Sequence, residues 1–374
     1  MNGGASAEKA RVFLVHWLFT SLYGMALDEY LALLLKHRFA VDAPYLPRAA
    51  FMGLSCTLTS LIRAYEDRRY GPEIAGVEVR EPLFVLGHWR SGTTYLHNLF
   101  ALNQRFAHPN VWRVFNPHTF LTTERYSDIV KLASPKTRLI DSMDVGADVP
   151  FEDEYATCGT LCSPILAGVF PQAAEHYDRY LTFRGVPEEE VGRWQKSLML
   201  FYKKMTWKFG RSLVLKSPPH TCRIRLLLKM FPDARFVHIH RDPYAVFRST
   251  KQTQRKGKHL ALQISDSPDF DARIIRRYRT MYDSFFEERR LIPEGRFHEL
   301  SFEELERDPV GVVRRIYERL DIPGFEEFEP SLKQYVRSVS GYRKNEFPEL
   351  PAGLREKIAH AWERSFEEWG YPRD

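Results

Sequence analysis

The stretch from Pro82 to Phe100, PLFVLGHWRSGTTYLHNLF, constrains the fold more than any other part of the chain. An apolar run ends at Gly87, four residues follow, and Gly92-Thr93-Thr94 opens a helical pattern. This order is typical of a phosphate-binding loop, because loop amides and the positive end of the helix converge on one anion. The spacing matches G-x-x-x-x-G-K-[ST], except that threonine replaces the lysine that serves nucleotide triphosphates. The sequence therefore predicts an anion-binding loop of an unusual kind.

The residues inside this loop have the chemistry that an anion site needs. Arg90 supplies a fixed cation, while Ser91, Thr93 and Thr94 offer hydroxyl donors. Gly92 lets the backbone approach a ligand closely. Because no acidic strand end of the Walker type is evident, a metal-dependent triphosphatase is a poor fit, and we expect no metal.

Beyond residue 75, short apolar runs alternate with helical stretches. The runs are residues 82–87, 211–219, 234–243 and 295–305. Such alternation predicts an α/β fold with a parallel sheet flanked by helices. We expect residues 1–75 to form an all-α segment and residues 76–374 the α/β domain. Its long insert, residues 101–210, is expected to cover the carboxyl edge of the sheet, where ligands bind in such folds.

Charge and cysteine content exclude several classes of function. The net charge is +6, but the 54 basic and 48 acidic residues are interleaved, which is typical of solvated helical surfaces. A nucleic-acid partner is therefore disfavoured, and a small polyanionic ligand is compatible. The four cysteines show neither a C-x-x-C pair nor matched histidine spacing, which indicates neither a zinc site nor a disulfide framework. A reducing, cytoplasmic location fits this pattern.

The N-terminal region is apolar enough to raise the question of a membrane. Its longest uncharged run, Val12 to Leu27, is shorter than the roughly 20 residues that a membrane-spanning helix needs. We therefore expect helices packed on the domain. A helix lying on the membrane surface, and with it a peripheral membrane contact, is the alternative.

A second anion site is indicated by the stretch FPDARFVHIHRDPYAVFRSTKQ. An apolar strand ends just before Arg241, and a helix follows that carries Ser249. An arginine at a strand end and a serine two helical turns later can converge on one phosphate.

Together these motifs resemble the sulfotransferases that use 3′-phosphoadenosine 5′-phosphosulfate, especially the bacterial branch of that P-loop-like superfamily. The resemblance implies that residues 90–94 hold the 5′-phosphosulfate, and that Arg241 and Ser249 hold the 3′-phosphate. The segment LVLKSPPH is similar to the one that supplies a catalytic lysine and histidine, here Lys216 and His220. The segment LSFEELERDP is similar to the family's Y-E-D-L-x-x-D-P. The resemblance covers roughly residues 80–345.

The chain departs from the pattern of this family at several positions. Arg90 stands where the cytosolic branch usually has lysine, which keeps the charge but changes a point charge into a planar fork. Phe302 replaces the adenine-stacking tyrosine, and Trp89 and Tyr342 are other candidates for a stacking ring.

Near its C-terminal end, the family has an R-K-G motif that binds phosphate, and this chain matches the motif only in part. Arg343 and Lys344 are followed by asparagine instead of glycine. By the resemblance, these two side chains are further candidates for contact with the 3′-phosphate.

Sulfuryl transfer is expected to pass through a loose transition state in which the attacking and leaving oxygens are in line. Such a reaction needs fixed cations and a base. Arg90 and Lys216 are the expected cations. His220 is the leading candidate for the base, since histidine as a residue type is suited to take a proton from an acceptor hydroxyl. Two prolines shift it from the cytosolic register, so Glu152 and Glu154 in VPFEDEYA remain alternatives.

The expected activity is transfer of sulfate to a hydroxyl or, in second place, an amine. The apolar N-terminal helices and the insert favour a lipid-like or polycyclic alcohol as acceptor. Rival interpretations are a P-loop nucleotide kinase or triphosphatase, and a non-catalytic nucleotide-binding scaffold.

Overall fold

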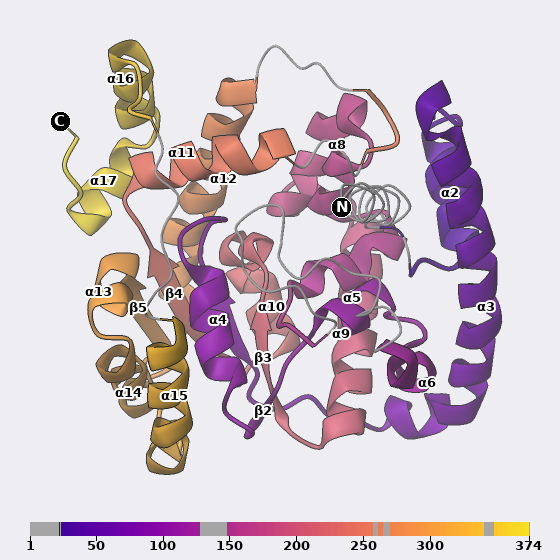
Figure 1. Cartoon of the computed structure of the whole chain (residues 1–374), viewed down its shortest axis with the longest axis horizontal. Helices are drawn as coiled ribbons and strands as arrows, with labels where there is room; N and C mark the ends of the chain where they lie inside the picture. Colours follow the sequence, from indigo (N-terminus) through magenta and orange to yellow (C-terminus); the bar gives the residue numbers. More distant parts are fainter. Residues whose placement is uncertain are drawn as a thin grey trace, which may run out of the picture. The chain divides into compact units, whose positions relative to one another are not determined.

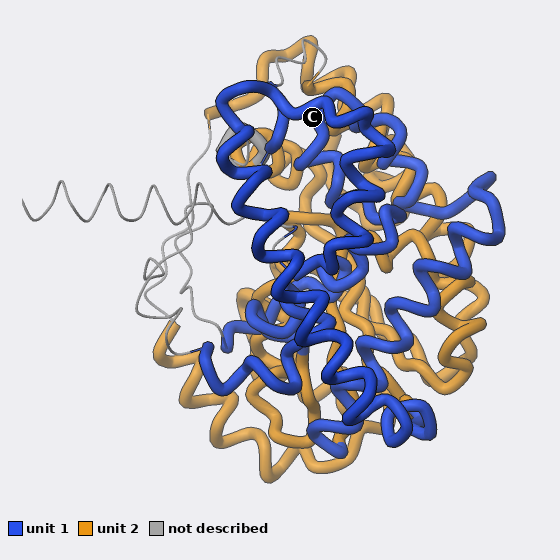
Figure 2. Tube along the Cα trace, turned by 90° about the vertical axis from the view of Figure 1, so that its right-hand side faces the viewer, with its two compact units in different colours: residues 1–78, 109–210, 255–266 blue, residues 79–108, 211–254, 267–374 orange. Residues whose placement is uncertain are grey.

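The structure is a computed structural model that describes residues 22, 24–127, 148–256, 261–264, 270–339 and 348–373. The chain forms two compact units (Figure 2). The helical unit comprises residues 1–78, 109–210 and 255–266, and the sheet unit comprises residues 79–108, 211–254 and 267–374. Each unit is therefore built from three separate stretches of sequence.

The sheet unit contains five parallel strands in the order β2-β3-β1-β4-β5. Their bounds are β1 Leu83–Leu86, β2 Phe106–Ala107, β3 Ser212–Lys216, β4 Arg235–His240 and β5 Phe297–Ser301. Four of the five are the apolar runs found in the sequence, so the prediction of a parallel sheet flanked by helices is confirmed.

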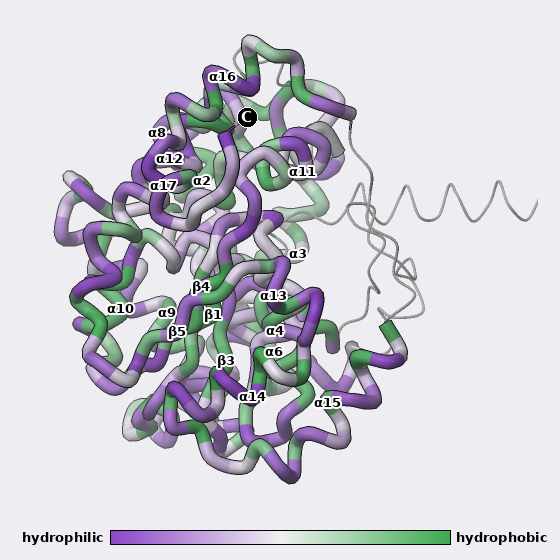
Figure 3. The backbone as a smooth tube through the Cα atoms, turned by 90° about the vertical axis from the view of Figure 1, so that its left-hand side faces the viewer, coloured by the Kyte–Doolittle hydropathy of each residue, from purple (hydrophilic) through white to green (hydrophobic). Residues whose placement is uncertain are grey.

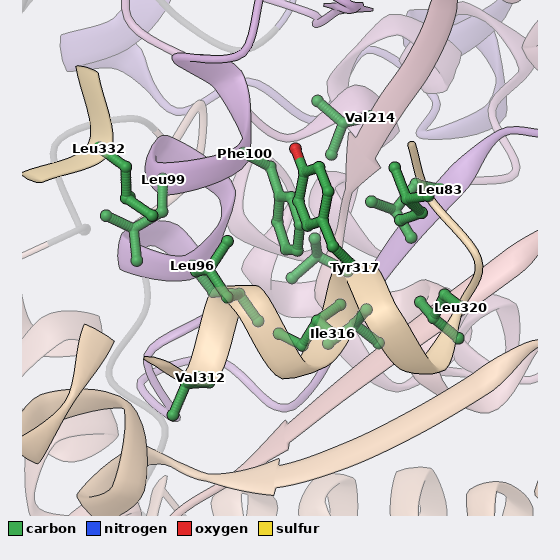
Figure 4. Packing of buried hydrophobic residues seen from close by; sticks show 14 of the residues in the cluster. Leu83, Leu96, Leu99, Phe100, Val214, Val312, Ile316, Tyr317, Leu320 and Leu332 are labelled. Atoms are coloured by element: carbon green, nitrogen blue, oxygen red, sulfur yellow. The ribbon is translucent and has the colours of Figure 1, made fainter. Parts of the chain in front are cut away.

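Strand β1 is apolar at every position because both of its faces are buried. Leu83 and Val85 belong to a cluster formed with helices on one face of the sheet, part of which is drawn in Figure 4. Phe84 points to the other face, where its ring lies 5.5 Å from the ring of Phe236 and 5.9 Å from that of Phe231. The hydrophobic colour of β1 in Figure 3 reflects this apolar composition.

The edge strand β2 was not predicted. Only Phe106 and Ala107 form it, within the stretch assigned to the insert, and they pair with Ser212 and Leu213 of β3. Two residues are too few to show a strand pattern in a sequence.

Helices of the sheet unit lie between and after its strands (Figure 1). They are α4 (Thr93–Ala101), α10 (Ile224–Met230), α11 (Pro243–Lys256), α12 (Phe270–Glu288), α13 (Phe302–Arg307), α14 (Pro309–Arg319), α15 (Phe325–Val339), α16 (Ala352–Ala361) and α17 (Glu363–Trp369), with short 3₁₀ helices at Pro218–Cys222 and Arg289–Leu291.

Within the described residues, regular structure in the helical unit is entirely helical. Its α-helices are α2 (Leu27–Lys36), α3 (Leu46–Ala75), α5 (Val111–Phe115), α6 (Phe120–Thr123), α8 (Ala174–Asp178) and α9 (Glu188–Phe209), and its 3₁₀ helices are Ala43–Tyr45, Glu124–Tyr126, Asp153–Thr160, Pro164–Gly168, Pro171–Ala173 and Arg179–Leu181. A buried ion pair of 2.8 Å between Glu66 and Lys204 joins α3 to α9. The all-α character expected for residues 1–75 holds over their described part.

The apolar run that begins at Val12 lies largely outside the described residues. Among the helices that are described, none combines the length and apolar character needed to cross a membrane.

Candidate functional site

Residues that follow four neighbouring strands form the site. Lys216 at the end of β3 is level with Val85 of β1, and Leu86 of β1 is level with His238 of β4. Because all strands are parallel, their carboxyl ends share one edge of the sheet. The phosphate loop therefore begins next to the segments that carry Lys216, Arg241 and Phe302.

Two glycines shape the loop between β1 and α4. Gly87 has φ +146° and Gly92 has φ +101°, a region that side chains rarely adopt. A Cβ on Gly87 would lie 2.5 Å from the carbonyl oxygen of Ile239, and one on Gly92 would collide with the ring of Phe302. Both positions therefore require glycine, as expected from the motif.

Helix α4 begins directly at the loop with Thr93. Among the described residues, no side chain caps this start. The first amides of a helix have no partner inside it, so those of α4 are available to an anion at the loop. Ser91 is fully buried, and its hydroxyl donates to the carbonyl oxygen of His88 at 2.7 Å, which closes the loop on itself.

Arg90 connects the two predicted anion sites. Its Nε donates to the hydroxyl of Ser249 at 2.8 Å, and its carbonyl oxygen accepts from Nη1 of Arg241 at 3.3 Å. Its φ of +72° is uncommon for a residue with a side chain. The structure thus brings together three side chains that lie up to 159 residues apart in the sequence.

The guanidinium groups of Arg90 and Arg241 both bring positive charge to the site. Burial lowers the pKa of Arg241 from its ordinary value, the charge of Glu303 opposes this effect, and the charge of Arg90 adds to it. The guanidinium of Arg241 also lies over the ring of Phe302, 4.4 Å from its centroid. Because the two positive charges disfavour each other, an anion bound at this site would stabilise both.

Lys216 is the last residue of strand β3, and His220 lies in the segment that follows this strand. Both side chains are buried, with Lys216 at the strand end and His220 in the 3₁₀ helix Pro218–Cys222. The hydroxyl of Thr221 accepts from the amide of Gly87 at 2.7 Å, which ties this helix to the phosphate loop. The ring of His220 packs edge-on against Phe84, with 5.6 Å between centroids.

The alternative bases belong to the helical unit. Glu152 precedes the 3₁₀ helix Asp153–Thr160, and Glu154 is fully buried inside it. Between them, Asp153 accepts a 2.7 Å hydrogen bond from the hydroxyl of Tyr202.

The last phosphate candidates, Arg343 and Lys344, lie outside the described residues, as does Tyr342. Trp89, the other candidate ring, lies in the loop with the guanidinium of Arg277 over it, 4.9 Å from the ring centroid.

Sequence reasoning missed the residues that hold the loop from outside. These include Thr221, Arg277 and Tyr282, whose hydroxyl accepts from the amide of His88 at 3.1 Å. Thr221 directly follows the predicted catalytic residue His220, and this neighbourhood could have identified it as a site residue. Arg277 and Tyr282 lie on α12, which carries no motif.

Within the described ranges, no group of three or more His, Cys, Asp or Glu side chains is arranged to hold a metal ion. All four cysteines are buried thiols that form no disulfide.

Comparisons with known proteins agree with this geometry. Residues 82–327 match the profile of a family described as the sulfotransferase family. The ω-hydroxy-β-dihydromenaquinone-9 sulfotransferases Stf3 of Mycobacterium bovis and Mycobacterium tuberculosis are 31% identical to the chain over 96% of its length and 92% of theirs. Human carbohydrate sulfotransferase 6 is 24% identical, over 79% of this chain and 78% of its own.

Solved structures show the same fold. The crystal structure of sulfotransferase STF9 from Mycobacterium avium has a TM-score of 0.71 at 22% identity, covering 88% of this chain and 87% of its own. That of STF1 from Mycobacterium tuberculosis has a TM-score of 0.65 at 16% identity, covering 96% and 97%. The chain therefore belongs to the sulfotransferase family, and it is an enzyme that transfers the sulfuryl group of 3′-phosphoadenosine 5′-phosphosulfate to an acceptor.

Proposed function

We propose that the donor nucleotide spans the two sites joined by Arg90. Residues 90–94 bind the 5′-phosphosulfate, Arg241 and Ser249 bind the 3′-phosphate, and the ring of Phe302 lies against the adenine. The observation that carries this assignment is the hydrogen bonding of Arg90 to both Ser249 and Arg241. It supports one continuous anion site that could bind two charged groups of the same nucleotide. Arg343 and Lys344 are further proposed contacts of the 3′-phosphate.

The proposed chemistry needs no covalent enzyme intermediate. The bond from sulfur to the bridging phosphate oxygen breaks while the acceptor oxygen bonds to sulfur, and negative charge gathers on the departing phosphate. Arg90 and Lys216 stabilise that charge in place. His220 takes the proton of the acceptor hydroxyl. Its place in the segment that follows Lys216, tied to the loop through Thr221, supports His220 over the alternatives Glu152 and Glu154.

We propose a lipid-like alcohol as the acceptor, with an amine as the second possibility. Support comes from the relatives named as sulfotransferases of a dihydromenaquinone and from the many aromatic and aliphatic residues of the helical unit. The insert, residues 101–210, is proposed to supply the residues that bind this acceptor. A screen of labelled sulfate transfer tests the class: apolar alcohols are expected to outcompete short sugars, and the reverse order would contradict it.

A peripheral membrane contact is proposed for one face of helix α3. Large apolar side chains on this face are exposed, and from residue 43 to residue 65 no exposed residue carries a charge. The exposed apolar side chains of this face are Leu46, Leu54, Leu58, Leu61 and Tyr65. Exposed Arg68 and Arg69 follow, with exposed Asp67 beside them and Glu73 paired with Arg69 at 3.5 Å. An apolar face bounded by charged residues matches a helix lying at a lipid surface.

The membrane proposal has a direct test. The full chain is expected to sediment with anionic phosphatidylglycerol vesicles, and Leu54→Glu with Leu61→Glu is expected to release it while PAP binding stays unchanged. Dimerisation that the same pair of substitutions abolishes, without vesicle binding, would assign the face to a second copy instead. A location in the cytoplasm, at the membrane surface, is proposed from this face and from the four cysteine thiols, which form no disulfide.

The donor assignment is tested by isothermal titration. We expect 3′-phosphoadenosine 5′-phosphate (PAP) to bind more tightly than ATP with Mg²⁺, and Arg241→Ala to abolish the preference for PAP over adenosine 5′-phosphate. A preference for ATP would contradict the assignment of Arg241 and Ser249 to a 3′-phosphate.

A further inference from the structure

The last residues of the chain make contacts that the proposed function does not use. Helix α17 ends at Gly370, whose φ of +66° turns the backbone. The next side chain, Tyr371, places its hydroxyl between two elements of the donor site. This hydroxyl lies 2.9 Å from Nδ1 of His240, the last residue of β4, and 3.0 Å from Oε2 of Glu303 in α13.

The protons of this chain of three residues can be assigned. The phenol of Tyr371 donates its one proton to the carboxylate of Glu303. Its oxygen must then accept from Nδ1–H of His240. Burial lowers the pKa of His240 to about 4, so the ring is neutral near pH 7 and keeps this tautomer. Burial, reinforced by the charge of Glu303, raises the pKa of Tyr371, so the phenol remains protonated.

Further contacts hold Tyr371 in place. The ring of Trp369 stacks on His240 with 4.7 Å between centroids and an interplanar angle of 1°. The hydroxyl of Tyr244 in α11 donates to the carbonyl oxygen of Arg373 at 2.8 Å, close to the C-terminus marked in Figure 1. The tail is thereby fixed on both sides of Tyr371.

Both residues bonded to Tyr371 adjoin the donor site directly. His240 precedes Arg241, and Glu303 follows Phe302. Among the charged groups that act on Arg241, Glu303 most strongly favours its protonated form. One hydroxyl thus bridges the strand end and the helix start that present the guanidinium and the ring.

We propose that Tyr371 is a positioning residue for the 3′-phosphate of the donor, acting through Glu303 and His240 on Arg241. This inference rests on the proposed assignment of Arg241 to that phosphate. Without the hydroxyl, Glu303 and the end of β4 lose their common partner, and among the described residues the guanidinium of Arg241 is oriented only by its contacts with Arg90 and Phe302. The expected loss is specific to ligands that carry a 3′-phosphate.

The test compares two ligands by isothermal titration: PAP, and adenosine 5′-phosphate, which lacks the 3′-phosphate. Tyr371→Phe is expected to weaken PAP binding by about tenfold, the size of one lost hydrogen bond to a charged group. Binding of adenosine 5′-phosphate should be unchanged. In the transfer assay, the KM for the donor should rise while kcat changes little. Tyr244→Phe is the matched control, since it removes a tail hydrogen bond that does not reach Glu303, and it should leave the ratio of the two affinities at the wild-type value.

The outcomes separate this inference from the donor assignment. If Arg241→Ala abolishes the preference for PAP while Tyr371→Phe retains it in full, the assignment stands and the positioning role is wrong. If Arg241→Ala leaves the preference intact, the assignment itself is wrong. If Tyr371→Phe weakens the binding of PAP and of adenosine 5′-phosphate equally, Tyr371 only stabilises the fold and does not position the 3′-phosphate. Should Tyr371→Phe fail to fold, Glu303→Gln provides the second variant, with the same selective loss expected.

Discussion

Nε of Arg90 donates a 2.8 Å hydrogen bond to the hydroxyl of Ser249, and so joins the phosphate loop to helix α11. Ser249 therefore has two tasks in the proposed site. It orients the guanidinium of Arg90, and its hydroxyl proton remains free to be donated to a phosphate oxygen, since the bond to Arg90 uses only its acceptor side.

Ser249→Ala is expected to weaken PAP binding by about tenfold, because the guanidinium of Arg90 loses its acceptor. Isothermal titration measures the change. Thr250→Val is the control, since the neighbouring Thr250 hydroxyl is buried and makes no hydrogen bond to any described residue. Equal affinities in the wild type and the Ser249 variant would contradict the role of this contact.

Gly92→Ala is expected to destabilise the protein and to impair PAP binding. A Cβ at φ +101° is strained and meets the ring of Phe302, which together cost on the order of 1–3 kcal/mol. Thermal unfolding with and without PAP tests this effect. Gly192→Ala in helix α9, where a Cβ meets no atom within 4 Å, should be neutral or stabilising.

His220→Gln is expected to lower kcat by roughly 10²–10⁴-fold with little effect on PAP affinity, as loss of a general base does. The parallel variants Glu152→Gln and Glu154→Gln should retain most of the activity. A large fall in kcat for one glutamate variant, with His220→Gln active, would move the base to the insert.

Lys216→Met should also act on kcat more than on ligand affinity. Its ammonium is proposed to stabilise charge that develops only as the bond from sulfur to the phosphate oxygen breaks. Single-turnover rates separate this step from binding. An increase in donor KM at constant kcat would show instead that Lys216 serves binding alone.

Stability should fall as the pH decreases below about 6.5, the ordinary pKa of histidine. Burial lowers the pKa of His88 to about 3, and the charge of Arg277 adds to this effect. Between these values the unfolded chain binds a proton that the folded protein excludes. Stability contributed by neutral His88 is therefore present above about pH 6.5 and is lost progressively toward about pH 3, with a slope of up to about 1.4 kcal/mol per pH unit.

Chemical unfolding at pH 7 and pH 5 measures this slope. His88→Gln, which removes one of the titrating groups, should reduce this slope, and partly buried His240 maintains part of it. His360→Gln at an exposed position of α16 should leave the slope unchanged. An unchanged slope in the His88 variant would show that His88 does not contribute.

The sequence predicted most of the sheet because its central strands are continuous apolar runs, such as Leu83–Leu86, bounded by glycine, proline and charge. Strand β2 escaped prediction because two residues carry no periodicity. The phosphate loop was predictable for a similar reason: its chemistry is local, and Gly87, Gly92 and the following helix occupy consecutive positions.

Contacts between distant residues could not be predicted in this way. The sequence named both Arg90 and Ser249, but their bond depends on how β1 and β4 pair, which no local pattern specifies. Tyr371 escaped notice altogether, since a tyrosine near a chain end has no distinctive spacing. The choice between His220 and the glutamates stays a prediction for the variants above to decide.

The hydrogen bond from Arg241 to the carbonyl oxygen of Arg90 has a consequence for the choice of nucleotide. It holds the guanidinium of Arg241 against the backbone of the loop, which restricts the distance between the two anion sites. The spacing between these two sites therefore selects which nucleotide can bind as donor. An isomer with its phosphate on the 2′ oxygen would present the wrong span, and we expect it to be rejected even though its charge is identical.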